Sequence, residues 1–438
     1  MIVMGGIVGS GIFINPYVVA RQVHTPALIL GAWVSGGVLA LIGAFIYAEL
    51  AARMPQVGGQ YAYLNKALHP AFGFLYGWVC LFVINGGATA AVAVTFAAYF
   101  RELFGGPIPE KAVAIAVVAA FVGVNCMGVK AGSSVQSFFM VLRILAVTMV
   151  VACGAWFLAQ AHPASLGPQP LLDRPVSFDL LTAFGAAMVP VVFAYGGWQT
   201  SNYVASEIRD PRRNLPRALL LGVLGIIALY LSVNFVYVAV LGPAGLATTE
   251  TPASEVMRRS LGGPGGKLIA AAIAISTLGF LSQSMLTYPR VYFAMSEDRL
   301  LPRLFSWLGS RSHAPVAAIL LQSATTIAAI LLGTYEQILS YVIVMDWLFF
   351  ALTATCLFVF RSRDIRAAGG EEPPEKSGFR VPGHPWTTAI FTVASWLIFL
   401  NTIYKYPRDT GIALCILFAG VPVFFLLRRR SQRPAGSA

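Results

Sequence analysis

The chain has 438 residues, of which 57% are hydrophobic and only 11% are charged, and its mean hydropathy is +0.74. A soluble protein of this length cannot bury so much apolar surface in a core, so the composition excludes that class and predicts a membrane protein. The net charge of +12 does not indicate nucleic-acid binding, because the basic residues are dispersed over short loops and an arginine-rich C-terminal end.

Apolar stretches long enough to cross a bilayer recur along the whole chain. They are continuous rather than alternating, which predicts an all-α membrane protein and not a β-barrel. The first stretch lacks a basic start and is followed by many others, so we interpret it as a helix and not as a signal peptide. Twelve spans are predicted, beginning near Met1, Ala27, Phe72, Ala112, Ser133, Phe178, Pro216, Lys267, Pro315, Glu336, Pro385 and Thr410.

The spans divide into two sets of five and a final pair. An odd number of spans in a set inverts the second set relative to the first. We expect a first repeat over residues 1–161, an inverted second repeat over 162–360, and a last part over 361–438 with a solvated cytoplasmic loop, spans eleven and twelve and a basic tail. Most lysines and arginines fall inside when both termini are cytoplasmic, which predicts this orientation in the cell (inner) membrane.

Glycines interrupt the first span at Gly9-Ser10-Gly11. Glycine lets the backbone leave helical geometry, and main-chain groups freed in this way are tolerated inside a membrane only where they line a cavity or bind something. A helix resuming at Gly11 presents free N–H groups and a positive dipole end, which suit a carboxylate, and Ser10 adds a hydroxyl donor. The alternative is that these small residues serve only close helix packing, as Gly5 and Gly9 would do.

The sixth span repeats this pattern with Pro190, aromatic residues and Gly196-Gly197. A half-helix that ends near Phe193 to Tyr195 exposes carbonyl groups and a negative dipole end, which suit an ammonium group. The two breaks together predict a binding site for a zwitterion.

The other residue classes with reactive side chains do not form a catalytic or metal-binding pattern. The five cysteines lie in apolar stretches without paired spacing, and the five histidines fall in loops or at span ends. No hydrolase or metalloprotease motif is present, so we do not expect an enzyme, a metal or an organic cofactor.

Four motifs in order resemble the amino acid, polyamine and organocation (APC) transporters, most closely the L-type amino acid transporters and their bacterial relatives. The resemblance covers nearly the whole chain. The motifs are Gly9-Ser10-Gly11-Ile12-Phe13, then Tyr47-Ala48-Glu49-Leu50 with Gly58-Gly59-Gln60-Tyr61-Ala62-Tyr63, then Phe193-Ala194-Tyr195-Gly196-Gly197-Trp198, and Glu207 with Asn214-Leu215-Pro216-Arg217-Ala218.

The resemblance implies a LeuT-like fold of five-plus-five inverted repeats with unwound helices 1 and 6, and alternating access around a central site. It implies that the N–H groups of Gly9, Ser10 and Gly11 hold the substrate carboxylate. The carbonyl groups of Ile7, Phe193 and Ala194 would take the amino group beside the Gly196 break. Phe193 would act as a gate that excludes water from the substrate.

Arg143 lies within the fifth span, where an arginine without partners is costly. The resemblance places it where many relatives carry a lysine whose ammonium group occupies the place of a sodium ion. Because a guanidinium group does not lose its proton in a protein, we predict a fixed cation that replaces sodium and not a proton carrier. The alternative is a side chain that extends to the cytoplasmic edge as a topology charge.

Asp346 is an acid deep within a span and therefore a functional candidate. It can bind protons, pair with a cationic substrate side chain, or hydrogen-bond to a neighbouring helix, and the sequence leaves these roles open. Further polar residues inside spans are candidates for the pocket or for helix packing. They are Asn85, Thr89, Gln199, Ser282 and Gln283.

Charged residues at the cytoplasmic span ends are candidates for an inner gate, although exposed loop charges are commonly only solvated. They are Glu49, Glu207, Arg212 and Arg213. The first half-helix is short, with Met1 only eight residues before Gly9, so we expect an incomplete inner gate or a truncated start.

The sequence thus predicts a transporter of neutral L-amino acids that works by exchange or facilitated movement. A cationic amino acid or polyamine carrier is the first alternative, and an ion channel is a weaker one. Animal L-type transporters are linked to a single-span glycoprotein through a cysteine after span three. Residues 101–111 contain no cysteine, so we expect no disulfide-linked heavy chain.

Overall fold

The computed structural model describes residues 2–9, 11–55, 58–105, 108–127, 129–161, 170–309, 314–367 and 379–431. All regular elements in these ranges are helices. Their bounds are α1 Ile2–Ile7, α2 Gly11–Gln22, α3 Pro26–Arg53, α4 Gln60–Ala67, α5 Pro70–Val79, η1 Cys80–Ile84, α6 Asn85–Phe104, α7 Glu110–Cys126, α8 Val129–Ala161, α9 Phe178–Tyr195, η3 Trp198–Glu207, α10 Pro211–Thr248, α11 Pro252–Leu261, α12 Gly263–Thr287, α13 Pro289–Glu297, η4 Arg303–Ser306, α14 Val316–Leu332, α15 Tyr335–Ala367, α16 Trp386–Lys405 and α17 Pro407–Ser431.

Nine helical segments among the described residues are long and apolar enough to cross a membrane, so the chain is a multi-pass helical membrane protein. Three of the twelve predicted spans are not among these segments. The first is divided between α1 and α2, while α7 and α14 have 17 residues each. The difference between the nine observed segments and the twelve predicted spans therefore comes from one broken helix and two short helices.

Local sequence explains where several helices begin and bend. Thr25 caps α3 by accepting a hydrogen bond from the Leu28 N–H, and Ser177 caps α9 in the same way through Leu180. α10 is kinked at Gly242, whose backbone is not helical and which precedes a proline. These signals set the helix ends but not their packing.

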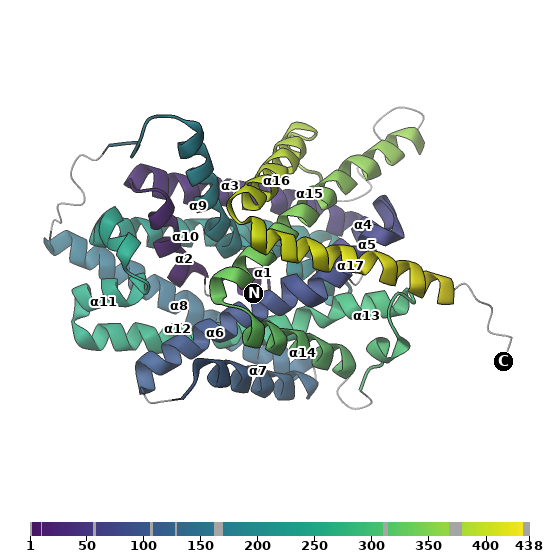
Figure 1. Ribbon diagram of the computed structural model, residues 1–438, viewed down its shortest axis with the longest axis horizontal. Helices are drawn as coiled ribbons and strands as arrows, with labels where there is room; N and C mark the ends of the chain where they lie inside the picture. The colour runs from purple at the N-terminus through teal and green to yellow at the C-terminus, as the bar shows by residue number, and fades with distance from the viewer. Residues whose placement is uncertain are drawn as a thin grey trace.

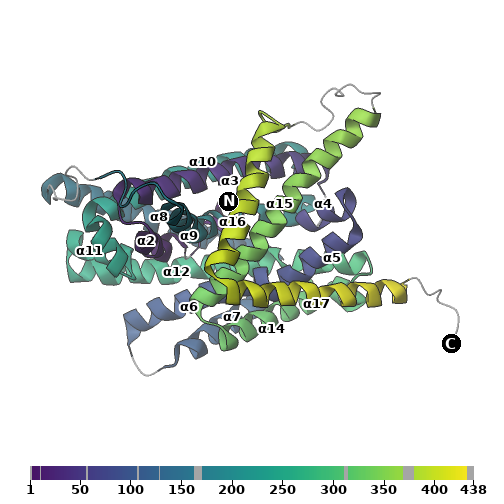
Figure 2. The ribbon, with the colours of Figure 1, turned by 45° about the horizontal axis from the view of Figure 1, so that its top comes forward.

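The broken helices lie at the centre of the molecule. Figure 1 places α1 near the middle of the view, and α2 packs against α9 and α10. α3 runs beside α10 in both views, and α12 packs against α8 and α6 (Figures 1 and 2). α17 lies along α5 and α15 at the periphery and leads to the C-terminus (Figure 2). The arrangement surrounds both breaks with long apolar helices.

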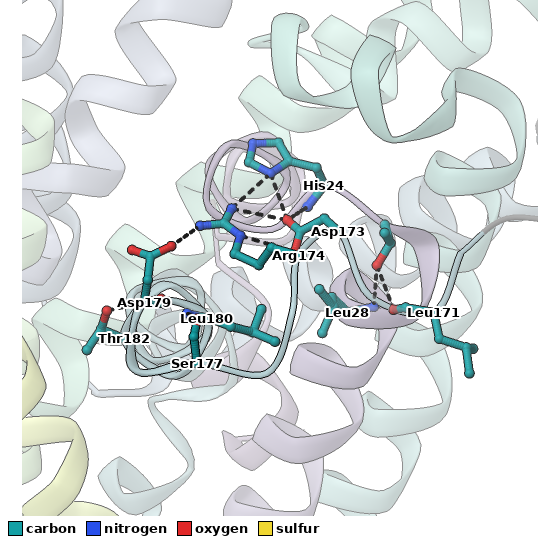
Figure 3. A network of polar contacts seen from close by, with 10 residues as sticks. His24, Leu28, Leu171, Asp173, Arg174, Ser177, Asp179, Leu180 and Thr182 are labelled. Carbon is teal, nitrogen blue, oxygen red and sulfur yellow. Dashed lines mark hydrogen bonds and ion pairs between the residues drawn. The ribbon is translucent and has the colours of Figure 1, made fainter.

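A polar network ties the α2–α3 link to the segment before α9 (Figure 3). His24 Nδ1 lies 2.9 Å from Asp173 Oδ2, Arg174 pairs with both Asp173 and Asp179, and Thr25 donates to the Leu171 carbonyl oxygen. Burial raises the pKa of Asp173, but hydrogen bonds from Arg174 and His24 outweigh this effect and lower the pKa to about 2. The network fixes the two broken helices relative to each other at one end.

Candidate functional site: two helix breaks at one cavity

The first break separates α1, which ends at Ile7, from α2, which begins at Gly11. The first-turn N–H groups of α2 therefore have no helical acceptors, and its positive dipole end points to the break. The Ile7 carbonyl oxygen accepts a hydrogen bond from the Tyr230 hydroxyl at 3.2 Å. Ser10 lies outside the described residues, so its predicted hydroxyl contact has no structural account.

The second break follows α9, which ends at Tyr195. Gly196 donates its N–H to the Phe193 carbonyl oxygen, and Gly197 donates to the Gln199 side chain at 2.9 Å. Residues Trp198–Glu207 then form a 3₁₀ helix. The exposed carbonyl end of α9 remains beside the break because no helical N–H follows it.

Glycines bring the two breaks into direct contact. Gly197 has φ of +99°, which side-chain-bearing residues rarely adopt, and a Cβ there would overlap the Gly6 carbonyl oxygen. A Cβ at Gly11 would lie 2.9 Å from the Ala194 Cα atom. Asn15 strengthens this contact by donating to the Pro190 carbonyl oxygen at 2.6 Å. The positive end of α2 and the carbonyl end of α9 therefore face one region.

A cavity of about 40 Å³ opens at this place. One water needs about 10–15 Å³, so a solute bound without rearrangement must be small. Predicted residues that line it are Ile7, Gly9, Gly11, Asn85, Phe193, Ala194, Gly196, Gln199 and Asp346. Lining residues that we did not predict include Thr200, Phe280, Tyr288, Ile343, Trp347 and Phe350.

Helical spacing contained a signal for some of the missed residues. Asp346 and Phe350 are four apart on α15, as are Ile343 and Trp347, so each pair shares a helix face. The four-residue spacing from Asp346 therefore marks Phe350 as a residue that can line the same cavity. No comparable signal marks Phe280.

Other predicted pocket residues lie elsewhere. Thr89 donates to the Asn85 carbonyl oxygen of its own helix at 2.7 Å, as a packing hydroxyl does. Ser282 is buried in α12, two residues beyond the lining residue Phe280. Gln283 is 1% exposed, and its amide makes no hydrogen bond with a described residue.

Arg143 is 1% exposed and lies in the middle of α8. Its Nε donates to the Ser276 carbonyl oxygen of α12 at 3.1 Å, and its Nη1 donates to the Val8 carbonyl oxygen at the first break. The guanidinium group is therefore turned toward the break and not toward the end of its helix. A fixed cation here satisfies a main-chain oxygen that the interrupted helix leaves free.

Glu49 forms a second buried charge cluster away from the cavity. Its carboxylate accepts hydrogen bonds from Arg53, from Arg361 at 2.7 Å and from the Val381 N–H at 2.7 Å. The cluster joins α3 to α15 and to the segment before α16. These partners do not include Arg212 and Arg213, the basic candidates for an inner gate, which lie exposed in the first turn of α10. The side chain of Glu207 lies outside the described part.

A family comparison identifies this architecture. The model of the family described as amino acid permease matches residues 1–425. The chain belongs to the amino acid permease family. It is consequently an amino acid transporter and not an enzyme.

Relatives of this amino acid permease match along nearly its whole length. It is 29% identical to the serine/threonine exchanger SteT of Bacillus subtilis (strain 168) over 98% of this chain and 95% of that one. It is 28% identical to the large neutral amino acids transporter small subunit 2 of Rattus norvegicus, over 97% of this chain and 78% of the relative. It is also 28% identical to the Asc-type amino acid transporter 1 of Homo sapiens, over 97% of this chain and 80% of the relative.

Proposed function

We propose that this permease exchanges small neutral L-amino acids across the cell membrane by alternating access. The observation that carries the proposal is the meeting of two main-chain breaks at one cavity, with a helix N-terminus from α2 and a carbonyl end from α9. A zwitterionic amino acid has one anionic and one cationic group to match them.

The N–H groups of Gly9, Ser10 and Gly11 hold the substrate carboxylate in this proposal, and the carbonyl groups of Ile7, Phe193 and Ala194 hold its amino group. Phe193 lines the cavity beside the Gly196 break, which supports its role as a gate that excludes water. Arg143 supplies the cation that stabilises the Val8 carbonyl oxygen in place of sodium.

The proposed topology counts α1 with α2, α7 and α14 as spans in addition to the nine long segments. Twelve spans then form a first repeat over 1–161, an inverted second repeat over 162–360, and a final part over 361–438. Both termini are cytoplasmic, because this orientation puts most basic residues inside. We expect no disulfide-linked subunit, since residues 101–111 contain no cysteine.

Small neutral substrates are supported by the size and charge of the cavity. Among the described residues, its lining contains no lysine, arginine or histidine and a single carboxyl group. The names of the relatives, a serine/threonine exchanger and a transporter of large neutral amino acids, point to neutral substrates and leave their size open. The small volume disfavours the long side chains of lysine and arginine.

Counterflow in proteoliposomes tests this function. Liposomes loaded with unlabelled L-serine, L-threonine, L-alanine, L-leucine, L-lysine or putrescine receive labelled L-serine outside. Trans-stimulation by the small neutral amino acids is expected. Stimulation only by lysine or putrescine would favour the cationic alternative, and uptake without any trans-stimulation would favour a channel.

A further inference from the structure

The carboxyl group of Asp346 occupies an unusual place in the cavity. Asp346 lies on α15 within a candidate membrane span and lines the same cavity as both helix breaks. In the part of the chain that the structure describes, its carboxyl group has no hydrogen-bond or ion-pair partner. It is thus an acidic group directed at the space that the substrate occupies in the proposed function.

Among the described residues, no positively charged group interacts with Asp346 or lines its cavity. The titratable neighbours are the phenols of Tyr47, Tyr203 and Tyr288 and the thiol of Cys80, which come from α3, η3, the α12–α13 junction and η1. Arg143, a buried cation at the first break, donates to carbonyl groups of Val8 and Ser276. The described surroundings of Asp346 therefore contain neutral hydroxyl and thiol groups but no counter-ion.

A substrate in the proposed pose does not supply a counter-ion either. Its ammonium group is bound by main-chain carbonyl groups, and its carboxylate adds a further negative charge to the cavity. An ionised carboxylate enclosed without a cation is unfavourable, whereas the same group in an open, hydrated cavity is readily ionised. Closure of the site over a neutral amino acid thus favours a carboxyl group that carries a proton.

Hydroxyl and thiol groups form a buried cluster near Asp346. The hydroxyl groups of Tyr203 and Tyr76 lie 2.5 Å apart, and Cys80 follows Tyr76 by one helical turn. This part of the chain includes the π-helical segment Cys80–Ile84, a conformation that is frequent at functional sites. The cluster provides buried groups that can exchange a proton with one another close to Asp346.

We propose that Asp346 is a proton-binding site that takes up one proton with each amino acid when the cavity closes and releases it when the cavity opens. This inference rests on the proposed function, because it uses the amino acid pose and alternating access. Net amino acid uptake is then accompanied by a proton moving in the same direction, and obligatory exchange carries protons both ways without net transfer.

The test measures the proton uptake that accompanies serine binding, with a pH-sensitive dye and the purified protein in weakly buffered detergent solution, so that exchange does not cancel the signal. Addition of L-serine raises the pH of the solution with the unmodified protein. Asp346→Asn loses this proton uptake but keeps measurable counterflow in proteoliposomes, while Asp346→Glu keeps the proton uptake. Asp179→Asn, which changes an exposed acid at the start of α9, is the matched control and keeps both signals.

Serine binding by the unmodified protein without proton uptake overturns the inference, whatever the variants do. It is also overturned if serine binding to Asp346→Asn still takes up a proton. Complete loss of serine binding by Asp346→Asn, in a protein that remains monodisperse, overturns it as well, because Asp346 then pairs with the substrate ammonium group. Absence of counterflow by the unmodified protein instead contradicts the proposed function itself.

Discussion

Replacement of Arg143 separates support of the first helix break from simple packing. The guanidinium group donates to the Val8 and Ser276 carbonyl oxygens and is almost fully buried. A methionine at this position fills similar space without a donor, so the Val8 carbonyl oxygen loses its partner at the break. Substrate affinity should fall because the open main-chain geometry is no longer stabilised.

The magnitude follows from the hydrogen bond at the break. A hydrogen bond to a charged group contributes about 1.5–3 kcal/mol, and about 1.4 kcal/mol corresponds to a tenfold change in affinity. Arg143→Met should therefore weaken serine binding by about ten- to a hundredfold. Arg143→Lys should lie between this variant and the unmodified protein, because one ammonium group cannot reproduce the planar fork of the guanidinium group.

Affinity and stability should respond differently to the methionine variant. Exchange of a buried charge for an apolar residue of similar volume is often neutral for folding, since the cost of burying the charge also disappears. Competition binding with labelled L-serine gives the affinity, and thermal unfolding in detergent gives the stability. Serine affinity of Arg143→Met within about twofold of the unmodified protein would refute a role of Arg143 at the break.

Three further predictions concern packing, charge and pH. Gly197→Ala should abolish counterflow, because its Cβ overlaps the Gly6 carbonyl oxygen and its φ is +99°. Gly225→Ala is the control and should keep counterflow, because its Cβ meets only the flexible end of a methionine side chain at 3.7 Å. Glu49→Gln should lower thermal stability by about 3–5 kcal/mol because it leaves buried arginine charge uncompensated, and an unchanged melting temperature would contradict this view. The pKa of Asp173 is lowered from 3.8 to about 2, so its stabilising effect is present above pH 3.8 and is lost as the pH falls to about 2. The melting temperature of Asp173→Asn should accordingly lie below that of the unmodified protein at neutral pH and converge with it near pH 2.

Glycine chemistry made the breaks predictable from sequence. Gly9 and Gly11 predict an interruption because their backbones leave helical geometry easily, and α2 begins at Gly11. Gly196-Gly197 predicts the end of the other half-helix, and α9 ends at Tyr195. The effect of a glycine on helix geometry acts within a few residues, so the local sequence is enough to predict these helix ends.

Contacts between residues that lie far apart in the chain could not be predicted from local sequence. Arg361 reaches Glu49 across 312 positions, and no local pattern selects it over Arg212. The π-helical segment Cys80–Ile84 depends on how α5 and α6 pack against their neighbours. Phe280 and Ser282 are two apart on α12, so an unknown rotation of that helix decides which one lines the cavity.

The most direct test of the main-chain clamp is competition for the amino acid that exchanges best, by its methyl ester and by its N-acetyl derivative. The ester lacks the carboxylate that the α2 end is proposed to bind, and the N-acetyl compound lacks the ammonium group proposed for the α9 carbonyl end. Both should fail to compete at concentrations where the parent amino acid displaces the label completely. Equal competition by either derivative would contradict the assignment of that end of the site.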